Sequence, residues 1–352
     1  MIRALAAIVL SLAALATARA QSVEDFYKGK RLTLTVGYGP GGGYDVFARL
    51  VARHMGKFIP GNPSITVQNM PGAGSLISAN YLYGVAPKDG SAFGLFARDM
   101  PLLALMGHND KVQFDPRKFT WLGSSSDFSD DAYMMIVRDD APVKSLKEMF
   151  RPDGPQLVLG GTADGATGGD VPRILQSALG LNNLKLVLGY RDSAAVFLAM
   201  ERNEVSGRTT DLSAIKSSRP DWLKPGGGYR VLVQYARRNR HPDYPDVPTA
   251  RELVSTEAGR ALIEFTETPL LTMARPFVAP PGVPEDRGKA LQTAFDATHR
   301  DRTFLDEAVK LGVYVTPVTA ADLMVSLERM AKASPELMEQ VRKLLEGNKG
   351  GG

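Results

Sequence analysis

Short apolar runs alternate with longer amphipathic stretches along most of the chain. Residues 31–37 (RLTLTVG) alternate and then run apolar, which predicts a strand buried in a sheet. In residues 44–58 the apolar side chains recur at helical spacing, which predicts a helix. Further strands are predicted at 64–68, 92–97, 134–137, 157–159, 184–188, 229–235 and 277–279, and further helices at 75–83, 172–179 and 193–202 and from residues 285, 304 and 320. Strands that alternate with helices indicate an α/β fold with parallel sheets and crossover helices.

The first twenty residues have the layout of a secretory signal peptide. Arg3 supplies a positive start, residues 4–16 carry no charge, and Ala18 and Ala20 are the small residues that a signal peptidase recognises. The apolar run is shorter than the roughly 20 residues that a membrane-spanning helix needs. We therefore predict cleavage before Gln21 and a mature protein in the periplasm.

Composition narrows the classes of function. A chain of 352 residues is too long for a single core and suits two domains. It contains no cysteine, so disulfides, thiol nucleophiles, thiolate metal sites and a lipid-anchored start are excluded. The formal net charge is +4 and the basic clusters are short, so we expect no nucleic-acid partner. The four histidines are scattered without metal-ligand spacing, and no metal site is predicted.

Three glycine-rich loops each follow a predicted strand and precede a predicted helix. They lie at residues 39–43, 72–74 and 160–169, and the helix after the third loop is predicted to open at Pro172. Glycine lets a ligand approach the backbone, and a helix start offers unpaired N–H groups that suit a carboxylate or a phosphate. Any one loop is explained by a tight turn. Three of them favour a shared ligand site beyond the carboxyl ends of the strands.

The first loop also fits a dinucleotide-binding fingerprint. Residues 37–42 (GYGPGG) read G-x-G-x-x-G, so an NAD-dependent oxidoreductase is a competing hypothesis. That fingerprint requires an acid near the end of the second strand to hold the ribose, but this strand ends in Gln68-Asn69. The sequence also offers no G-x-S-x-G elbow and no evident pair of nucleophile and base. A protein without enzymatic activity or cofactor is therefore favoured.

Five motifs, in the same order, resemble those of the tripartite tricarboxylate transporter receptors, the Bug or TctC-like solute-binding proteins. Residues 39–45 resemble the family's P-x-x-G-G-x-x-D loop, and residues 67–74 resemble its V-E-N-x-P-G-A-G with Gln68 in place of the acid. The other three motifs are a P-D-G turn with one inserted residue at 87–90, P-D-V-P-T at 245–249 and F-x-A-P-x-G-x-P at 277–284. Together they span most of the mature chain.

The resemblance implies a two-lobed type II periplasmic binding-protein fold, in which each lobe is a mostly parallel sheet flanked by helices. Lobe one is expected to hold residues 21–124 and 231–352, and lobe two residues 125–230. The family's ligands are mostly small carboxylates, held between the lobes largely by backbone N–H groups. The resemblance also implies delivery of the solute to a two-component membrane permease of the tripartite type. A receptor that feeds a membrane sensor kinase would share the fold and stays an alternative; we expect a monomer.

The candidate ligand-binding residues lie on both predicted lobes. On lobe one they are Gly41, Gly42, Asp45, Gly72, Ala73, Gly74, Ser75 and Arg98, and on lobe two Gly161, Thr162, Asp164, Thr167, Tyr190, Arg191 and Asp211. Asp164 departs from the family's G-x-G-S-like loop and would repel a second ligand carboxylate unless Arg98, Arg191 or Arg208 offsets it. Asp45 suits a helix start as well as it suits ligand contact. The acidic cluster of Asp127, Asp130 and Asp131 is interpreted as a solvated loop or a weak ion site.

Overall fold

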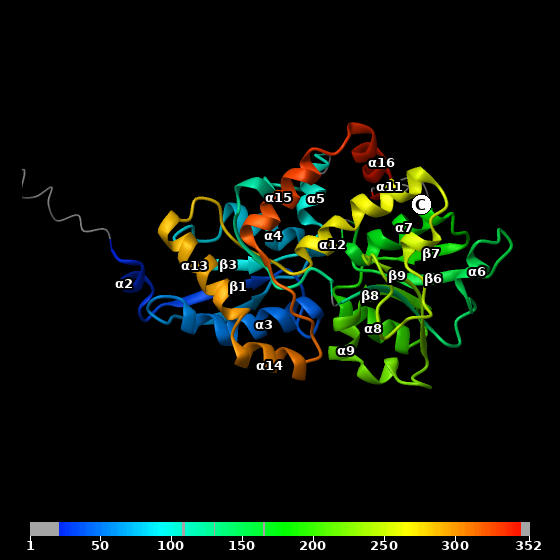
Figure 1. Ribbon diagram of the computed structural model, residues 1–352, viewed down its shortest axis with the longest axis horizontal. Coiled ribbons are helices and arrows are strands. Elements are labelled where there is room, and N and C mark those ends of the chain that lie inside the picture. Colours follow the sequence, from blue (N-terminus) through cyan, green and yellow to red (C-terminus); the bar gives the residue numbers. More distant parts are fainter. Residues whose placement is uncertain (1–20, 108–109, 130, 165, 346–352) are drawn as a thin grey trace, which may run out of the picture.

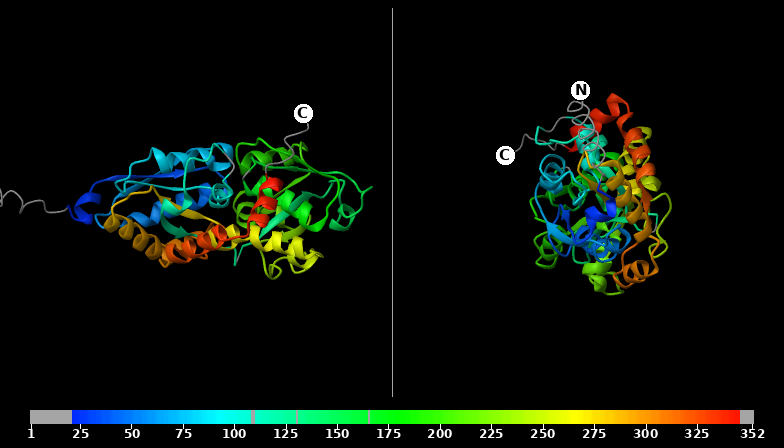
Figure 2. Two further views of the ribbon diagram at one scale, coloured as in Figure 1. Left: turned by 90° about the horizontal axis from the view of Figure 1, so that it is seen from above. Right: turned by 90° about the vertical axis from the view of Figure 1, so that its left-hand side faces the viewer.

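The protein consists of two lobes that lie end to end, each built around one β-sheet (Figure 1; Figure 2, left). The computed structural model describes residues 21–107, 110–129, 131–164 and 166–345. The predicted signal peptide at residues 1–20 therefore lies outside the described residues. We call the body around the six-stranded sheet the first lobe and the body around the five-stranded sheet the second lobe.

The first sheet has the strand order β11-β4-β10-β3-β1-β2. Its strands are β1 (Arg31–Val36), β2 (Ser64–Asn69), β3 (Ala92–Leu95), β4 (Thr120–Ser124), β10 (Pro276–Ala279) and β11 (Val318–Thr319). Strands β2, β1 and β3 are parallel, with Leu34 opposite both Val67 and Phe93, whereas β10 runs antiparallel to β3 and β4. The sheet is thus mixed, because β10 enters it from the opposite direction after the chain returns from the second lobe.

Helices cover both faces of the first sheet. They are α2 (Val23–Tyr27), α3 (Gly43–Met55), α4 (Leu76–Gly84), α5 (Met100–Leu105), α13 (Glu285–Thr298), α14 (Arg302–Lys310) and α15 (Ala320–Ala331), with 3₁₀ turns at Gly56–Phe58, Ala73–Ser75 and Pro116–Lys118. Leu32, Leu34 and Val36 alternate onto the face that packs against α3, α13 and α14. The other face carries Phe96 and Trp121 against α4, α5 and α15. Because alternate side chains of a strand point to opposite faces of the sheet, the large apolar side chains of β1 all enter the core against α3, α13 and α14.

The second sheet has the strand order β7-β6-β8-β5-β9. Its strands are β5 (Tyr133–Arg138), β6 (Leu157–Gly160), β7 (Leu184–Val187), β8 (Gly207–Asp211) and β9 (Tyr229–Tyr235). The helices of this lobe are α6 (Leu146–Met149), α7 (Thr167–Leu179), α8 (Ser193–Glu201) and α9 (Leu212–Ser218), with a 3₁₀ turn at Pro220–Leu223. Strands β7, β6 and β8 are parallel, and β5 is antiparallel to β8 and β9. This sheet is mixed for the same reason as the first, since β5 enters from the other lobe.

The later part of the chain contributes to both lobes. Helices α10 (Ala250–Leu253), α11 (Glu257–Thr266) and α16 (Pro335–Leu345) add side chains to the second lobe's main core, and α11 packs on α7. Helix α12 (Thr268–Met273) packs on α15 and β4 of the first lobe. Buried Glu267 joins α11 to α12 and accepts hydrogen bonds from Ala236 N (3.0 Å) and Arg251 Nε (2.6 Å). The α11–α12 segment therefore spans the junction between the lobes.

One predicted helix start is wrong. Helix α7 begins at Thr167, and Pro172 lies inside it instead of opening it. Proline lacks the N–H that would bond the carbonyl four residues earlier, here Gly168. Pro172 is the sixth residue of the helix, beyond the first turn, so α7 continues to Leu179 with this one hydrogen bond missing. The third glycine-rich loop consequently ends at Ala166, the residue that caps α7.

Candidate functional site

A polar cleft lies where the strand ends of the two lobes face each other. Its lining consists of Tyr38, Gly43, Tyr44 and Arg98 from the first lobe and Tyr133, Thr162, Thr167, Gly168, Ser193, Arg208, Thr210 and Asp211 from the second. The cleft has a volume of about 390 Å³, open solvent included. Most of these residues follow the carboxyl ends of β1, β3, β6 and β8 or begin helices α3, α7 and α8. This is the position at which open α/β sheets bind ligands.

An ion network crosses the cleft around Asp211. The carboxylate caps α9 by accepting from Ala214 N (2.8 Å), and it also accepts from Arg275 Nη2 (2.7 Å). Arg98 Nη2 lies 3.7 Å from the other carboxylate oxygen. Burial alone would raise the pKa of Asp211, but Arg275 and Arg98, with the Ala214 N–H and Arg208, together hold the pKa below its ordinary value. One acid of the second lobe thus faces two buried guanidinium groups of the first, so this group of three side chains keeps a net positive charge.

Aromatic hydroxyls hold the Arg98 side chain in place. Tyr44 Oη accepts from both Arg98 Nε (2.8 Å) and Arg98 N (3.1 Å), and the Tyr44 ring stacks on Tyr38 at 4.8 Å between centroids. The guanidinium carbon lies 4.8 Å from the centre of the Phe128 ring. Arg98 is only 1% exposed, and its Nη1 has no hydrogen-bond partner among the described residues. A buried donor of a charged group without an acceptor is costly, and an anionic ligand oxygen would satisfy it.

The loop of residues 72–75 is strained and touches the second lobe. Gly72, Ala73, Gly74 and Ser75 all have positive φ angles (144°, 46°, 63° and 91°), which is unfavourable for the two non-glycine residues. Ser75 Oγ accepts from the N–H of Ala97 (3.0 Å) and fixes the loop against the end of β3. A Cβ atom placed on Gly74 would lie 2.9 Å from the Cβ of Ala166. Gly74 therefore lies at a contact between the lobes, and none of the four predicted residues is among the lining residues of the cleft.

Asp45 fixes the first glycine-rich loop. Its carboxylate accepts hydrogen bonds from Gly41 N (2.9 Å), Arg49 Nε (2.9 Å) and Asn69 Nδ2 (2.8 Å), and it is buried. Burial would raise the pKa of Asp45, but these hydrogen bonds hold it below its usual value. Gly42 caps α3, and neither it nor Gly41 is a lining residue of the cleft. These contacts give Asp45 the structural role at the helix start.

The predicted residues of the second lobe divide into two groups. Thr162 and Thr167 line the cleft, as Asp211 does. The remaining four do not line it. Gly161 N bonds the carbonyl of Val187, and Asp164 pairs with Arg173 (2.6 Å). Tyr190 packs against the core cluster that includes Phe197 and Trp222, and exposed Arg191 pairs with Asp192 (2.9 Å). The charge of Asp164 is therefore balanced by Arg173, and not by Arg98, Arg191 or Arg208 as the sequence suggested.

Several lining residues were missed. They are Tyr38, Gly43, Tyr44, Tyr133, Gly168, Ser193 and Thr210; Arg208, which the sequence offered only as a possible partner of Asp164, lines the cleft as well. Tyr133 enters the site because β5 pairs antiparallel with β8, which places it opposite Asp211. Strand β8 (GRTTD) has no apolar pattern and was not predicted, so neither the pairing nor the position of Arg208 could be inferred. A strand signal at 207–211 would have been needed to find them.

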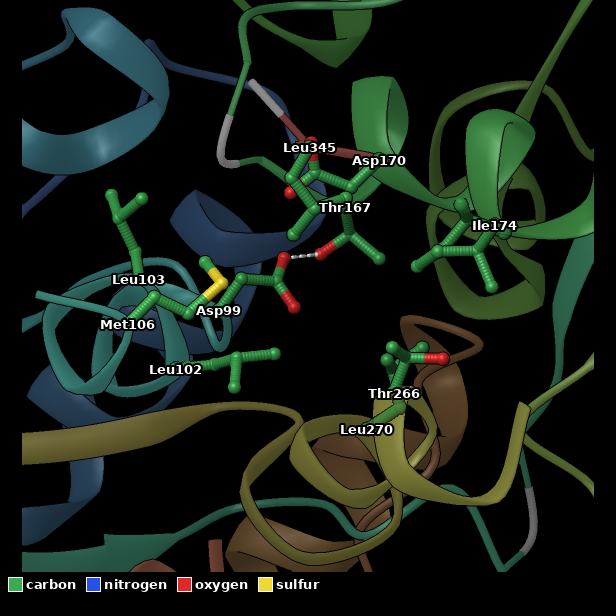
Figure 3. A pocket seen from close by; sticks show the side chains of 11 residues that line it. Asp99, Leu102, Leu103, Met106, Thr167, Asp170, Ile174, Thr266, Leu270 and Leu345 are labelled. Carbon is green, nitrogen blue, oxygen red and sulfur yellow. Dashed lines mark hydrogen bonds between the residues drawn. The ribbon is translucent and has the colours of Figure 1, made fainter. Parts of the chain in front are cut away.

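A second pocket adjoins the cleft and is mostly apolar (Figure 3). Side chains of α5, α7, α12 and α16 line it: Leu102, Leu103, Met106, Val171, Ile174, Leu270 and Leu345, with Asp99, Asp170 and Thr266. Thr167 lines both cavities, and its hydroxyl hydrogen-bonds the Asp99 carboxylate across the two lobes. Burial raises the pKa of Asp99, although Thr167 and Arg98 act against it. The Asp99–Thr167 bond is thus a polar contact between the lobes beside an apolar space.

One member of the acidic cluster, Asp131, is not solvated. Asp131 is 1% exposed and accepts from Ala132 N (2.8 Å) and Ser213 N (3.2 Å). Burial, together with Asp211, raises its pKa to about 6. Asp130 lies outside the described residues. Within the described ranges there is also no group of three or more His, Cys, Asp or Glu that could hold a metal ion.

The structure brings together one serine and histidine that the sequence did not pair. His299 Nε2 lies 2.8 Å from Ser125 Oγ, and its Nδ1 lies 2.7 Å from the carbonyl of Phe295. Burial lowers the pKa of His299 to about 4, so the ring is neutral. Both residues are buried and neither lines the cleft. The pair therefore braces the segment that leaves the first lobe after β4.

Comparisons with known proteins agree on one family and one fold. A family model described as the tripartite tricarboxylate transporter family receptor matches residues 47–341. A UPF0065 protein of Bordetella pertussis is 24% identical over 338 residues, which are 93% of this chain and 94% of that protein. The periplasmic binding protein BugD has a TM-score of 0.71 at 20% identity and covers 90% of this chain and 98% of its own. MatC of Rhodopseudomonas palustris, solved with bound malate, has a TM-score of 0.67 at 20% identity over 90% of this chain and 99% of its own. The structural matches confirm the predicted two-lobed periplasmic binding-protein fold.

Proposed function

The chain belongs to the tripartite tricarboxylate transporter receptor family, and from this premise we propose that it captures a small organic acid between its lobes for a two-component membrane permease. The family match spans residues 47–341 and confirms the resemblance stated from the five sequence motifs. A receptor of this family binds its solute and delivers it to a transporter, so the protein is not an enzyme. An NAD-dependent oxidoreductase, the competing hypothesis from residues 37–42, is therefore not the function that we propose.

One observation carries the carboxylate proposal. Arg98 is buried, lines the cleft and leaves Nη1 without an acceptor among the described residues. A carboxylate is the common partner of a guanidinium and forms short, charge-assisted hydrogen bonds with it. The hydroxyls of Thr162 and Ser193 line the same cleft and can donate to the remaining ligand oxygens, whereas the Thr167 hydroxyl already donates to Asp99. MatC, which has a similar fold, was solved with bound malate, and this supports a small organic acid as the solute.

The start of α7 adds a second anchor. Thr167 and Gly168 are its first two residues and line the cleft, and the first N–H groups of a helix lack intrahelical partners. They carry a partial positive charge that favours an anion. We assign direct solute contact to Arg98, Thr162 and Thr167, and a positioning role to Asp211. The backbones of the loops at 41–42, 72–75 and 161 are expected to close around the solute.

Closure of the two lobes is the proposed mechanism of capture. A solute held by both lobes stabilises the closed form through a hinge motion. We propose that α10, α11 and α16 move with the second lobe and that the residues following β4 and β9 act as hinges. The predicted limits of lobe two, residues 125–230, would then be extended by these helices.

We place the mature protein in the periplasm, as the signal-like residues 1–20 and the likeness to the periplasmic protein BugD suggest. In the part of the chain that the structure describes, no helix is long and apolar enough to cross a membrane. The permease is expected to recognise the closed form. Solute uptake in cells that lack the receptor gene tests this partnership, and the alternative partner, a sensor kinase, would leave uptake unchanged.

Thermal unfolding of the mature protein against a metabolite panel tests the solute class. The protein is unfolded and refolded first to remove any bound solute, and the panel holds di- and tricarboxylates, aromatic acids, amides and NAD. A ligand at 100 times its Kd adds about 2.7 kcal/mol to the free energy of unfolding, which corresponds to a rise of about 2–4 °C in Tm. A rise with carboxylates and none with NAD supports the proposal. A rise with NAD alone would overturn it.

A further inference from the structure

Two buried arginines face the cleft, one from each lobe. Arg98 follows β3 in the first lobe, and Arg208 lies in β8 of the second. They are 1% and 3% exposed, and both line the cleft. Tyr133 lies near both groups: the Arg98 guanidinium carbon is 5.6 Å from the centre of its ring, and a Cβ atom placed on Gly168 would lie 3.7 Å from Arg208 Nη2 and 3.9 Å from the Tyr133 hydroxyl. The two positive charges therefore converge on one small space.

Arg208 differs from Arg98 in the partners that it has. Its donors reach only neutral oxygens, namely the carbonyls of Thr209 (3.2 Å) and Ser193 (2.9 Å) and Ser193 Oγ (3.2 Å). No carboxylate of the described residues lies within 4.0 Å of it. Burial lowers the pKa of Arg208, but a guanidinium stays protonated in proteins. Arg208 is thus a buried positive charge that no carboxylate of the described residues contacts directly, although Asp211 and Asp192 stabilise it from farther away.

The acids around the cleft are all committed to protein partners. Asp211, the one acid among the described lining residues, binds Arg275 and Ala214 N and faces Arg98. Asp131, behind it, accepts from Ala132 N and Ser213 N. Asp99 accepts from Thr167 on the side of the apolar pocket. To reach any of these three carboxylates, a ligand cation would first have to displace a guanidinium or a hydrogen bond.

We infer that the cleft accepts acids without a positively charged group and rejects α-amino acids, with Arg208 as the residue that sets this selectivity. This rests on the proposed function and narrows its solute class. An ammonium group beside the ligand carboxylate would be held close to Arg98 and Arg208, and like charges in a buried site repel strongly. A hydroxyl in the same position can instead donate to or accept from Thr162, Ser193 and the other cleft hydroxyls.

Matched ligand pairs test the selectivity. Isothermal titration calorimetry on the refolded mature protein compares malate with aspartate, 2-hydroxyglutarate with glutamate, and lactate with alanine, together with adipate, benzoate and inorganic phosphate. We expect acids without an ammonium group to bind. Wherever one member of a pair binds, the hydroxy acid should bind at least tenfold more tightly than the corresponding amino acid. An amino acid that binds within tenfold of its hydroxy partner, or more tightly than every other acid, would overturn the inference and leave the receptor function intact. If no organic acid binds, the proposed function fails and this inference falls with it.

Two variants at Arg208 separate charge from structure. Arg208→Gln removes the positive charge, so the affinity for the hydroxy acid divided by that for the amino acid should fall at least threefold. Arg208→Lys keeps the charge and should leave this ratio largely unchanged. Arg302→Gln, on the exposed α14, is the control for the loss of one positive charge, because the Arg302 side chain is 86% exposed. Tm is measured for each variant. A folded Arg208→Gln protein with an unchanged ratio would show that Arg208 does not set the selectivity.

Discussion

Arg275 Nη2 in the first lobe donates a hydrogen bond to Asp211 Oδ1 in the second lobe at 2.7 Å, and the arginine is completely buried. Arg98 Nη2 approaches the other oxygen of the same carboxylate at 3.7 Å. Two segments far apart in the sequence thus meet on one acid at the floor of the cleft. The contact joins the lobes directly, so Asp211 links the stability of the fold to the shape of the site.

Asp211→Asn should destabilise the protein. The change leaves Arg275 and Arg98 buried without an anionic partner, and breaking a buried ion pair by removing one member costs about 3–5 kcal/mol. Urea unfolding measures the loss. The exposed Asp246→Asn is the matched control and should leave the free energy of unfolding within about 0.5 kcal/mol of the wild type. An Asp211→Asn protein as stable as this control would contradict a bridging role for the carboxylate.

Arg98→Gln should weaken solute binding. A hydrogen bond to a charged group is worth about 1.5–3 kcal/mol, which corresponds to roughly 10- to 150-fold in Kd. Calorimetry with the acid found in the ligand screen measures the change, and Arg302→Gln should bind as the wild type does. Equal affinity of Arg98→Gln and wild type would remove the observation on which the carboxylate proposal rests.

The sequence predicted the elements whose apolar pattern is regular. Residues 31–36 alternate, and they form β1 with Leu32, Leu34 and Val36 on one face. Strand β8 (GRTTD) was missed because it carries no large apolar side chain, although all five of its residues are buried. It is buried because it lies between β6 and β5 in the sheet, and its own composition does not indicate this burial. The antiparallel pairing of the strands that link the lobes was missed as well, since pairing direction is a property of the whole chain path.

The sequence predicted part of the lining of the candidate cleft. The glycine-rich loops after strands lie at the same edge of the sheets as this cleft, and its lining includes Arg98, Thr162, Thr167 and Asp211. Tyr133 and Arg208 reach the cleft only through the pairing of β5 with β8. Local sequence cannot reveal that Asp164 would find Arg173 in the second turn of α7. Side-chain partners of this kind depend on packing that a motif does not encode.

Gly74→Ala should hinder closure of the lobes. The added methyl would meet Ala166 Cβ at 2.9 Å, closer than carbon atoms pack, and the φ of +63° adds backbone strain of about 1–2 kcal/mol. We expect weaker solute binding and a larger radius of gyration by X-ray scattering in the presence of solute. Gly180→Ala is the control for strain alone, because Gly180 has a φ of +69° and open space around it. If both variants bind alike, contact at Gly74 does not limit closure.

Stability should fall in acid because of His299. Burial lowers its pKa from 6.5 to about 4, so the folded protein holds the ring neutral while the unfolded chain binds a proton more readily. The contribution of His299 is fully present above pH 6.5 and is lost as the pH falls toward 4, by up to about 1.4 kcal/mol per pH unit. In His299→Gln, which cannot titrate but can still bond Ser125, the difference in free energy of unfolding from the wild type should therefore depend on pH in this window. Urea titrations at pH 7, 6, 5 and 4 measure that difference, and the acids common to both proteins cancel in it. A difference that stays constant from pH 7 to pH 4 would mean that the ring accepts a proton inside the folded protein, and that the Ser125–His299 contact is looser than the 2.8 Å separation indicates.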